Sequence, residues 1–277
     1  MFGEEVPYEE EQINECPDYR RANWSIGFGL QAIDGLEPSD YLLELAELHI
    51  AGMITFEEIE KKLAEYYQKA TLRVGEGSAK YYKAGAYQAN SMEGDFSSLR
   101  ITEILSTDGF TLSPATLLSY HRIIFSGIAE FHYPVGKFRT VNITKEESVL
   151  NGDTVSYTIH QNIRDALAWD FEQEKNNDYL NLEKAEAAHR AMKFISTIWQ
   201  IHPFRDGNTR TMAVFAIKYL RHLGFEVDNE PFKNHSKFFR DALVLANYHR
   251  KGQTDKYLMM FTENALLKGK RDLRIER

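Results

Sequence analysis

The chain has 277 residues, of which 43% are hydrophobic and 27% are charged, so it can bury a core as one large domain or two small ones. Its formal net charge is −8 and no dense cluster of Lys and Arg occurs, which excludes a typical duplex-DNA binder. The single cysteine, Cys16, excludes a disulfide framework and fits a reducing compartment, and no apolar run reaches the ~18 residues of a membrane helix.

The first third of the chain predicts a small helical unit. Residues 1–18 are polar and lack the apolar stretch of a secretory signal, so we expect a cytoplasmic protein that makes no contact with a membrane. Three short amphipathic helices follow, over residues 19–34, 39–51 and 55–67. Gly35 and Gly52 are typical C-terminal caps, and Thr55 and Glu58 have the spacing of a capping box. Residues 73–85, which are Gly-rich and basic, indicate a linker.

The remainder is mostly helical, with one change of period. A helical pattern resumes at residue 86, and Ser113-Pro114 is typical of the start of another helix. Val141 and Ile143 then alternate with polar residues, and Asn151-Gly152 is a strong turn signal, which together predict a small β-hairpin over about 140–160. Further helices are expected from 162, over 182–201, from 208 to 224, and over about 235–249 and 254–268. We therefore predict an all-α fold with one hairpin, divided into domains 1–72 and 73–277.

The strongest functional signal is the run His202-Pro203-Phe204-Arg205-Asp206-Gly207-Asn208-Thr209-Arg210, which joins two predicted helices. Pro203 ends the first helix, and the loop leads into the N-terminus of the second, which attracts anions. Arg210 offers a planar fork for phosphate oxygens. Asp206 is a hard ligand for Mg²⁺, an ion that typically binds one or two carboxylates together with substrate phosphates. His202 can act as a general base near neutral pH. Taken alone, a structural histidine, an N-cap aspartate and an ion-paired arginine are alternatives; together the residues indicate phosphoryl or nucleotidyl transfer.

This window resembles the signature of the Fic family, His-Pro-Phe-x-Asp/Glu-Gly-Asn-Gly/Lys-Arg. Two further stretches resemble the family: Gly136-Lys137-Phe138-Arg139 before the hairpin, and 240–248, which looks like the helix that closes the nucleotide pocket. The resemblance covers roughly 90–250. It implies a Fic-type helical bundle that uses ATP and Mg²⁺ to transfer AMP to a Ser, Thr or Tyr hydroxyl of a target protein, with the chain itself as another candidate acceptor.

The resemblance also implies a role for each site residue. His202 would deprotonate the target hydroxyl, and Asp206 would hold Mg²⁺ on the α- and β-phosphates. Gly207 and Asn208 would form the anion hole, Arg210 would bind the β-phosphate, and Phe204 and Asn247 would complete the nucleotide site. The hairpin would be a flap that holds the target backbone by strand addition.

The N-terminal unit has a resemblance of its own. Residues 29–38 and 50–55 look like the small antitoxins that accompany Fic toxins, so the chain resembles a fused toxin–antitoxin pair. In that family an inhibitory Glu pairs with a second Arg three residues after the signature. Here Asp34 stands for the Glu and Ala213 for the Arg, so we expect at most a weak brake at Asp34. The run Asn90-Ser91-Met92-Glu93-Gly94 also looks like the inhibitory motif, but Ala89 replaces its Ser/Thr, and we set it aside.

Two alternatives to AMP transfer stay open. Thr209 replaces the usual Gly or Lys and Ala213 removes a cation, so a phosphotransferase with a reversed nucleotide is one alternative. A catalytically silent regulatory module is the other, although the intact His202, Asp206, Asn208 and Arg210 argue against it. The sequence leaves the target protein undetermined, and a homodimer is one candidate oligomeric state.

Overall fold

The computed structural model describes residues 16–75 and 91–276, and the regular structure within these ranges is entirely helical. The prediction of an all-α fold is therefore confirmed there. The helices are α1 Pro17–Gly29, α2 Asp40–Ile50, α3 Phe56–Gly75, α4 Ser91–Ser106, α5 Pro114–Phe125, α6 Ile163–Lys175, α7 Lys184–Ile201, α8 Asn208–His222, α9 Glu230–Asn234, α10 Ser236–Ala246 and α11 Lys256–Leu266, with short 3₁₀ helices η2 Leu30–Asp34, η3 Ser148–Leu150 and η4 His160–Asn162. Within the described ranges, no helix combines the length and apolar character needed to span a bilayer.

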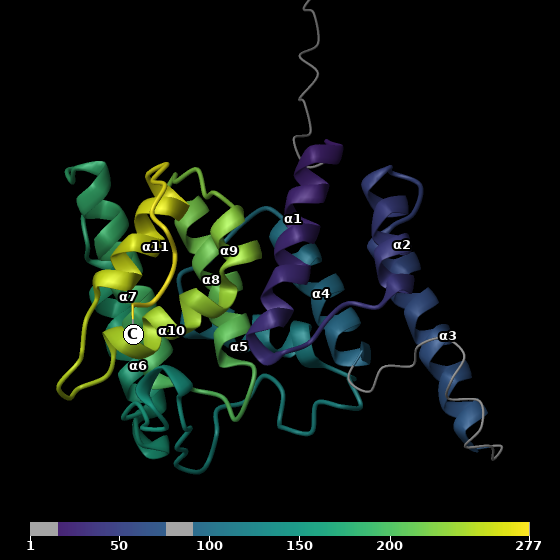
Figure 1. The fold of residues 1–277 in the computed structure, drawn as a ribbon, viewed down its shortest axis with the longest axis horizontal. Helices are drawn as coiled ribbons and strands as arrows, with labels where there is room; N and C mark the ends of the chain where they lie inside the picture. Colours follow the sequence, from purple (N-terminus) through teal and green to yellow (C-terminus); the bar gives the residue numbers. More distant parts are fainter. Residues whose placement is uncertain (1–15, 76–90, 277) are drawn as a thin grey trace, which may run out of the picture.

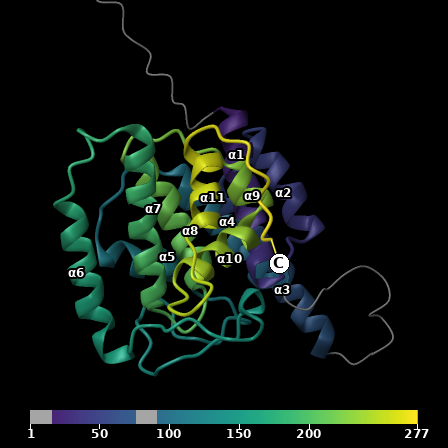
Figure 2. The same ribbon diagram turned by 60° about the vertical axis from the view of Figure 1, so that its left-hand side comes forward.

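Helix α8 lies at the centre of the bundle (Figures 1 and 2). Every residue from Asn208 to Leu220 is buried, so α8 has no solvent-facing stripe. Helices α4, α5 and α7 pack against it, and α6 and α11 pack against the outer side of α7. Helix α1 packs on α4 and α9, while α2 and α3 lie at the right-hand edge of Figure 1. The loop between α7 and α8, which carries the signature, therefore lies at one end of two well-packed helices.

The N-terminal helices follow the prediction closely. Helix α1 gives way to η2, which ends at Gly35 with a φ of 71°. The capping box is confirmed, because the backbone N–H of Thr55 donates to Glu58 at 2.8 Å and that of Glu58 donates to Thr55 Oγ1 at 3.2 Å. Helix α3 continues to Gly75, so the start of the predicted linker at residues 73–75 is wrong. The rest of that linker, from residue 76, lies outside the described residues.

The predicted β-hairpin over 140–160 is not a pair of strands. The turn is confirmed, with Asn151 and Gly152 both at positive φ, and Glu147 N–H donates across it to the carbonyl of Asp153. The flanking carbonyls are taken by side chains instead of a ladder: Arg139 donates to those of Val141 and Thr158, and Gln200 donates to that of Ser156. An isolated two-stranded hairpin is marginal in water, so these side chains decide its shape. We call residues 140–160 the flap loop.

Candidate functional site

His202 caps the C-terminus of α7 in the left-handed region, with φ 52° and ψ 62°. Its Nδ1 lies 3.3 Å from the carbonyl oxygen of Trp199. Since a carbonyl only accepts, Nδ1 carries the proton and Nε2 keeps a lone pair, which is the tautomer that a general base requires. Burial, followed by the positive charge of Lys145, lowers the pKa of His202 to about 3. The imidazole is therefore neutral at physiological pH.

The signature loop holds its own shape. The side-chain amide of Asn208 accepts from the N–H of Phe204 at 2.9 Å and donates to the Phe204 carbonyl at 3.0 Å. Gly207 has a φ of 70°, and a Cβ on it would lie 2.4 Å from the ring of Phe125. Only glycine fits this position, since both the dihedral and the space exclude a side chain. The first N–H groups of α8 have no intrahelical acceptor and lie at this end of the helix, as the predicted anion site requires.

Asp206 is fixed from its backbone by a buried histidine that the sequence reasoning did not select. His121, on α5, has no exposed surface, and its Nε2 donates to the Asp206 carbonyl at 3.1 Å. Its Nδ1 accepts the N–H of Gly136 at 2.8 Å, and its ring stacks on Phe204 with 3.9 Å between centroids. Burial lowers the pKa of His121 to about 4, so it stays neutral and both hydrogen bonds persist. Its place on the buried face of α5 gives no sequence signal for this role.

The Asp206 carboxylate can take one metal position. Its Oδ1 accepts the N–H of Gly207 at 2.7 Å, which orients the group at the start of α8. Among the residues described here, no cluster of three or more His, Cys, Asp or Glu side chains could hold a metal. An Mg²⁺ ion at this site would therefore rest on Asp206, phosphate oxygens and water, a set that suits this ion.

Arg139 ties the flap loop to His202. It is 4% exposed, and its Nε donates to the carbonyl of His202 at 2.8 Å, while its backbone N–H donates to that of Pro203 at 2.8 Å. The same guanidinium reaches Val141 and Thr158, one at each end of the flap loop. Arg139 thus holds His202 and the flap loop together, and burial lowers the pKa of Arg139.

Arg210 is held by two carboxylates from the N-terminal part of the chain. It is 1% exposed, with Nη2 2.6 Å from Glu93 Oε1 and Nε 2.7 Å from Asp34 Oδ2. Nη1 donates to Gln31 at 3.3 Å, and the guanidinium lies 4.7 Å from the centroid of Phe125. The Nε–H does not point at Asp34, so that contact is an ion pair without a well-aligned hydrogen bond. We call Asp34, Glu93 and Gln31 the Arg210 clamp.

The clamp corrects two expectations from the sequence. Asp34 does find a buried cation, because it pairs with Arg210 inside the signature instead of with position 213. Ala213 is fully buried in the core. Setting Glu93 aside was also wrong, since it makes the shorter and better-aligned contact with Arg210. The absence of Ser or Thr at Ala89 misled the sequence reasoning, because the carboxylate alone makes the contact.

Two other predicted positions serve packing in this structure. Thr209 Oγ1 accepts the indole N–H of Trp199 at 3.1 Å, which explains a threonine where the signature has Gly or Lys. Asn247 donates to Ser196 Oγ at 2.8 Å and to the Leu243 carbonyl at 2.9 Å, so its amide nitrogen joins α10 to α7. The nucleoside contact that the resemblance implies for Asn247 stays a prediction.

The flap loop lies over His202 and is attached to α10 and the residues after it. The ring of Tyr157 lies 4.1 Å from that of His202, measured between centroids, which contributes to the low exposure of His202. Buried Glu147 pairs with Arg240, and Asp153 accepts from Tyr248 at 2.7 Å.

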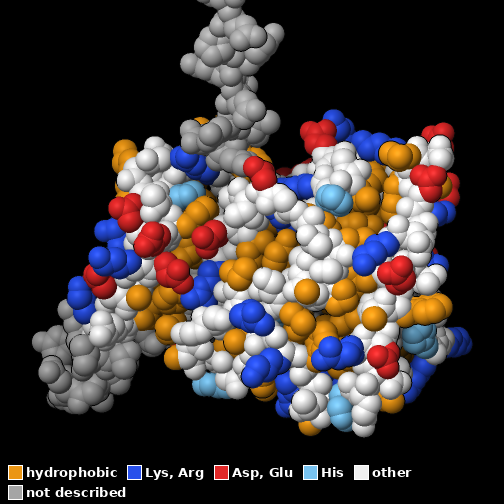
Figure 3. Space-filling view, turned by 180° about the vertical axis from the view of Figure 1, so that it is seen from behind, with side chains coloured by type: hydrophobic (Ala, Val, Ile, Leu, Met, Phe, Trp, Pro, Cys, Tyr) orange, Lys and Arg blue, Asp and Glu red, His pale blue; other side chains and the backbone are white. Residues whose placement is uncertain are grey.

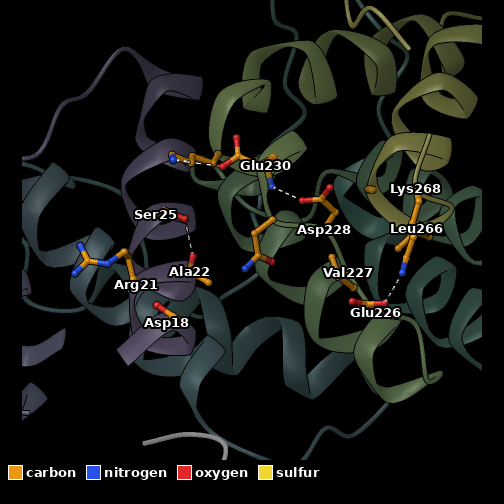
Figure 4. Close-up of a pocket in the computed structure, with 13 residues that line it drawn as sticks. Asp18, Arg21, Ala22, Ser25, Glu226, Val227, Asp228, Glu230, Leu266 and Lys268 are labelled. Carbon is orange, nitrogen blue, oxygen red and sulfur yellow. Dashed lines mark hydrogen bonds and ion pairs between the residues drawn. The ribbon is translucent and has the colours of Figure 1, made fainter. Parts of the chain in front are cut away.

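A separate cavity of about 610 Å³ lies between α1 and the segment that joins α8 to α9 (Figure 4). Its lining mixes charges, and Glu226 pairs with Lys268 across one side. No signature residue lines it, so it is distinct from the site above.

Comparison with known proteins supports the reading of the signature. Residues 111–220 match the profile of the Fic/DOC family. The probable protein adenylyltransferase y4lH of Sinorhizobium fredii is 43% identical over 63 residues, which make up 22% of this chain and 32% of that protein. The chain thus spans about a third of the length of this relative.

Solved structures share the fold at low identity. The N-terminal FIC domain of Bep8 from Bartonella sp. 1-1C has a TM-score of 0.51 and 17% identity, covering 66% of this chain and 88% of that one. BepC from Bartonella tribocorum, solved with bound AMPPNP, has a TM-score of 0.50 and 19% identity, covering 66% and 90%. A Fic domain from Bartonella quintana with bound ADP has a TM-score of 0.51 and 18% identity, covering 66% and 88%. Residues 111–220, which include the signature, are therefore similar to the Fic/DOC family, and the fold is shared with solved Fic domains.

Proposed function

We propose that this chain is a protein adenylyltransferase that transfers AMP from ATP to a Ser, Thr or Tyr hydroxyl of a protein. The observation that carries the proposal is the fixed tautomer of His202, whose free Nε2 belongs to the same loop as the N-terminus of α8. A base and an anion site joined by one rigid loop suit the attack of a hydroxyl on a phosphate. The relative named as a probable adenylyltransferase and the neighbours with bound AMPPNP or ADP support ATP as the donor.

The proposed reaction uses the residues of the loop in turn. Nε2 of His202 takes the proton of the acceptor hydroxyl while its oxygen forms a bond to the α-phosphorus. The bond from that phosphorus to the bridging oxygen of the β-phosphate breaks, and pyrophosphate leaves. The N–H groups at the start of α8 stabilise the charge on the phosphate oxygens. Mg²⁺, when bound at Asp206, would neutralise charge on the α- and β-phosphates.

We propose further that the Arg210 clamp restrains this activity. Arg210 is the arginine that the family resemblance assigns to the β-phosphate, and Asp34 and Glu93 occupy its guanidinium. A phosphate must displace carboxylates to reach it, and two carboxylates near the phosphate site also repel the nucleotide. The residues that supply the clamp come from η2 and α4, so the N-terminal part of the chain is the proposed brake.

Parallel incubations with α-labelled and γ-labelled ATP test the function. Transfer of the α-label to protein, with release of pyrophosphate, is the expected result. Transfer of the γ-label instead would favour the phosphotransferase alternative. No label from either, in both the native chain and a Glu93→Gln variant with a released clamp, would refute both and leave the silent module.

A further inference from the structure

A cationic groove lies at the foot of the flap loop. Residues 136–140 and 160–164 enclose about 460 Å³, and the lining includes Lys137, Arg139 and Arg164 but no Asp or Glu. This departs from the chain as a whole, whose formal net charge is −8. The groove is therefore a local positive site on an acidic protein. On the face opposite to Figure 1, Lys and Arg side chains gather along the lower part (Figure 3).

The positive charge of the groove is not neutralised internally. Lys137 and Arg164 are exposed, and neither has an ion-pair partner among the residues that the structure describes. Arg139 is buried, and the hydrogen bonds of its guanidinium go to backbone carbonyls of Val141, Thr158, Ile201 and His202. Carbonyls satisfy its N–H groups but leave its charge in place.

The groove adjoins the proposed base. Arg139 lines it and at the same time donates to the carbonyl of His202 at 2.8 Å. Lys145, on the flap loop, is close enough for its charge to contribute to the lowered pKa of His202. An acceptor chain whose hydroxyl reaches His202 must therefore place neighbouring residues beside these cations.

We propose that the groove binds acidic residues next to the hydroxyl of the acceptor protein, so that the substrates of this enzyme are acidic segments. This rests on the proposed function and adds to it the class of acceptor. Complementary charge raises the rate of encounter and rejects basic competitors. A protein segment fits better than nucleic acid, because the groove is short and the surrounding chain is acidic.

Three fluorescein-labelled peptides with one Tyr, flanked by Glu, Gln or Lys, provide the test. We expect kcat/KM for transfer of the α-label to be roughly tenfold or more higher for the Glu peptide than for the Lys peptide, with the Gln peptide between. The difference should shrink from low salt to 0.5 M, since surface charges are screened over ~8 Å at physiological ionic strength. Fluorescence anisotropy of the native chain should give the same order of binding without turnover.

A double charge reversal assigns the effect to the groove. Lys137→Glu with Arg164→Glu should reverse the peptide preference while the affinity for Mg·ATP stays within about twofold of the native value. The matched control is Lys61→Glu with Lys62→Glu on α3, which changes the net charge equally at two other exposed positions and should keep the preference for Glu.

The outcomes separate this proposal from the proposed function. If peptides of all three charges are labelled and bound alike, the groove does not select acidic acceptors, although AMP transfer stands. If no acceptor takes up the α-label from either the native chain or the Glu93→Gln variant, both ideas fall. An equal loss of preference in the control pair would attribute the effect to overall charge and overturn the assignment. The assignment would also be overturned if a single-stranded oligothymidine bound as tightly as the Glu peptide and lost this binding on the same charge reversal.

Discussion

Replacing Glu93 by Gln should release the nucleotide site. The substitution keeps the size of the side chain and removes the charge from the 2.6 Å contact with Arg210 Nη2. A hydrogen bond to a charged group contributes about 1.5–3 kcal/mol, and each 1.4 kcal/mol corresponds to a factor of about ten. The Gln amide oxygen can still accept from Nη2, so only part of this energy is lost, and a phosphate that competes for the same guanidinium should bind roughly tenfold more tightly. Turnover in the labelling assay should rise in parallel, provided that nucleotide binding limits it.

Asp34→Asn should have the smaller effect. The Asp34 side chain is 27% exposed against 15% for that of Glu93, and its contact with Arg210 lacks a well-aligned hydrogen bond. Solvent screens the more exposed pair, so we expect a gain of only a few-fold. The double variant should exceed either single change, but it leaves a buried guanidinium without a carboxylate. It should melt at a lower temperature until nucleotide is added.

Titration calorimetry with Mg·ATP and thermal melting measure the two effects together. Glu60→Gln is the matched control, because Glu60 forms a 2.8 Å ion pair with Arg100 outside the signature. It should change neither nucleotide affinity nor turnover. If Glu93→Gln and the double variant bind Mg·ATP with native affinity, then Arg210 is not a phosphate ligand, or the clamp does not restrain it, and the proposed regulation is wrong.

Four further predictions address His202, the signature loop and the buried histidines His49 and His121. His202→Ala should reduce transfer by roughly 10²–10⁴-fold with unchanged Mg·ATP affinity, and near-native turnover would show that another group is the base. Asp206→Asn should weaken the Mg²⁺ dependence of nucleotide binding, whereas Arg210→Ala should weaken binding with or without Mg²⁺, and calorimetry that shows no change in either would contradict the assignment. His121→Phe keeps the stacking but loses the hydrogen bond to Asp206, so the Mg²⁺ concentration for half-maximal activity should rise. The control His49→Phe removes a buried histidine that is hydrogen-bonded to Trp24, and it should lower stability alone. Equal Mg²⁺ profiles for the two variants would refute the positioning role of His121. Finally, burial lowers the pKa values of His49 and His121 from 6.5 to about 4, so between these values the unfolded chain binds protons that the folded chain does not. Thermal melting should therefore show stability that is intact above about pH 6.5 and falls towards pH 4. A flat profile would contradict the burial argument.

The elements that local chemistry specifies were predictable from the sequence. Caps and turns act within a few residues, so Ser113 at the start of α5, the capping box at Thr55 and the turn at Asn151 all occur where expected. The prediction of a β-hairpin at the flap loop was wrong because backbone carbonyls of the loop accept from Arg139 and Gln200, which lie outside the alternating segment. The five-residue helix α9 was also missed, since one turn carries too little periodicity to detect.

In the site, too, features set by neighbouring residues were predictable and features set by tertiary packing were not. The signature is contiguous, so its residues and the loop that they form could be predicted from spacing alone. The contacts of Arg210 could not, because Gln31, Asp34 and Glu93 reach it from η2 and α4 and only tertiary packing brings them together. His121 was hidden for a related reason: on the buried face of α5 it has the pattern of a core residue, and its hydrogen bonds go to backbone atoms of other segments.

The Arg210 clamp has a consequence for the order of events during synthesis. Gln31 and Arg210 are separated by 179 residues, so the N-terminal part of the chain is made long before its partner exists. At ~5–20 residues per second, a ribosome needs roughly 10 to 35 s to cover that distance. During this interval Asp34 has no guanidinium to pair with and stays hydrated. Once Arg210 emerges, the carboxylates are already present at high local concentration, whereas ATP must arrive by diffusion. The clamp therefore forms within the chain as it folds and requires no second molecule.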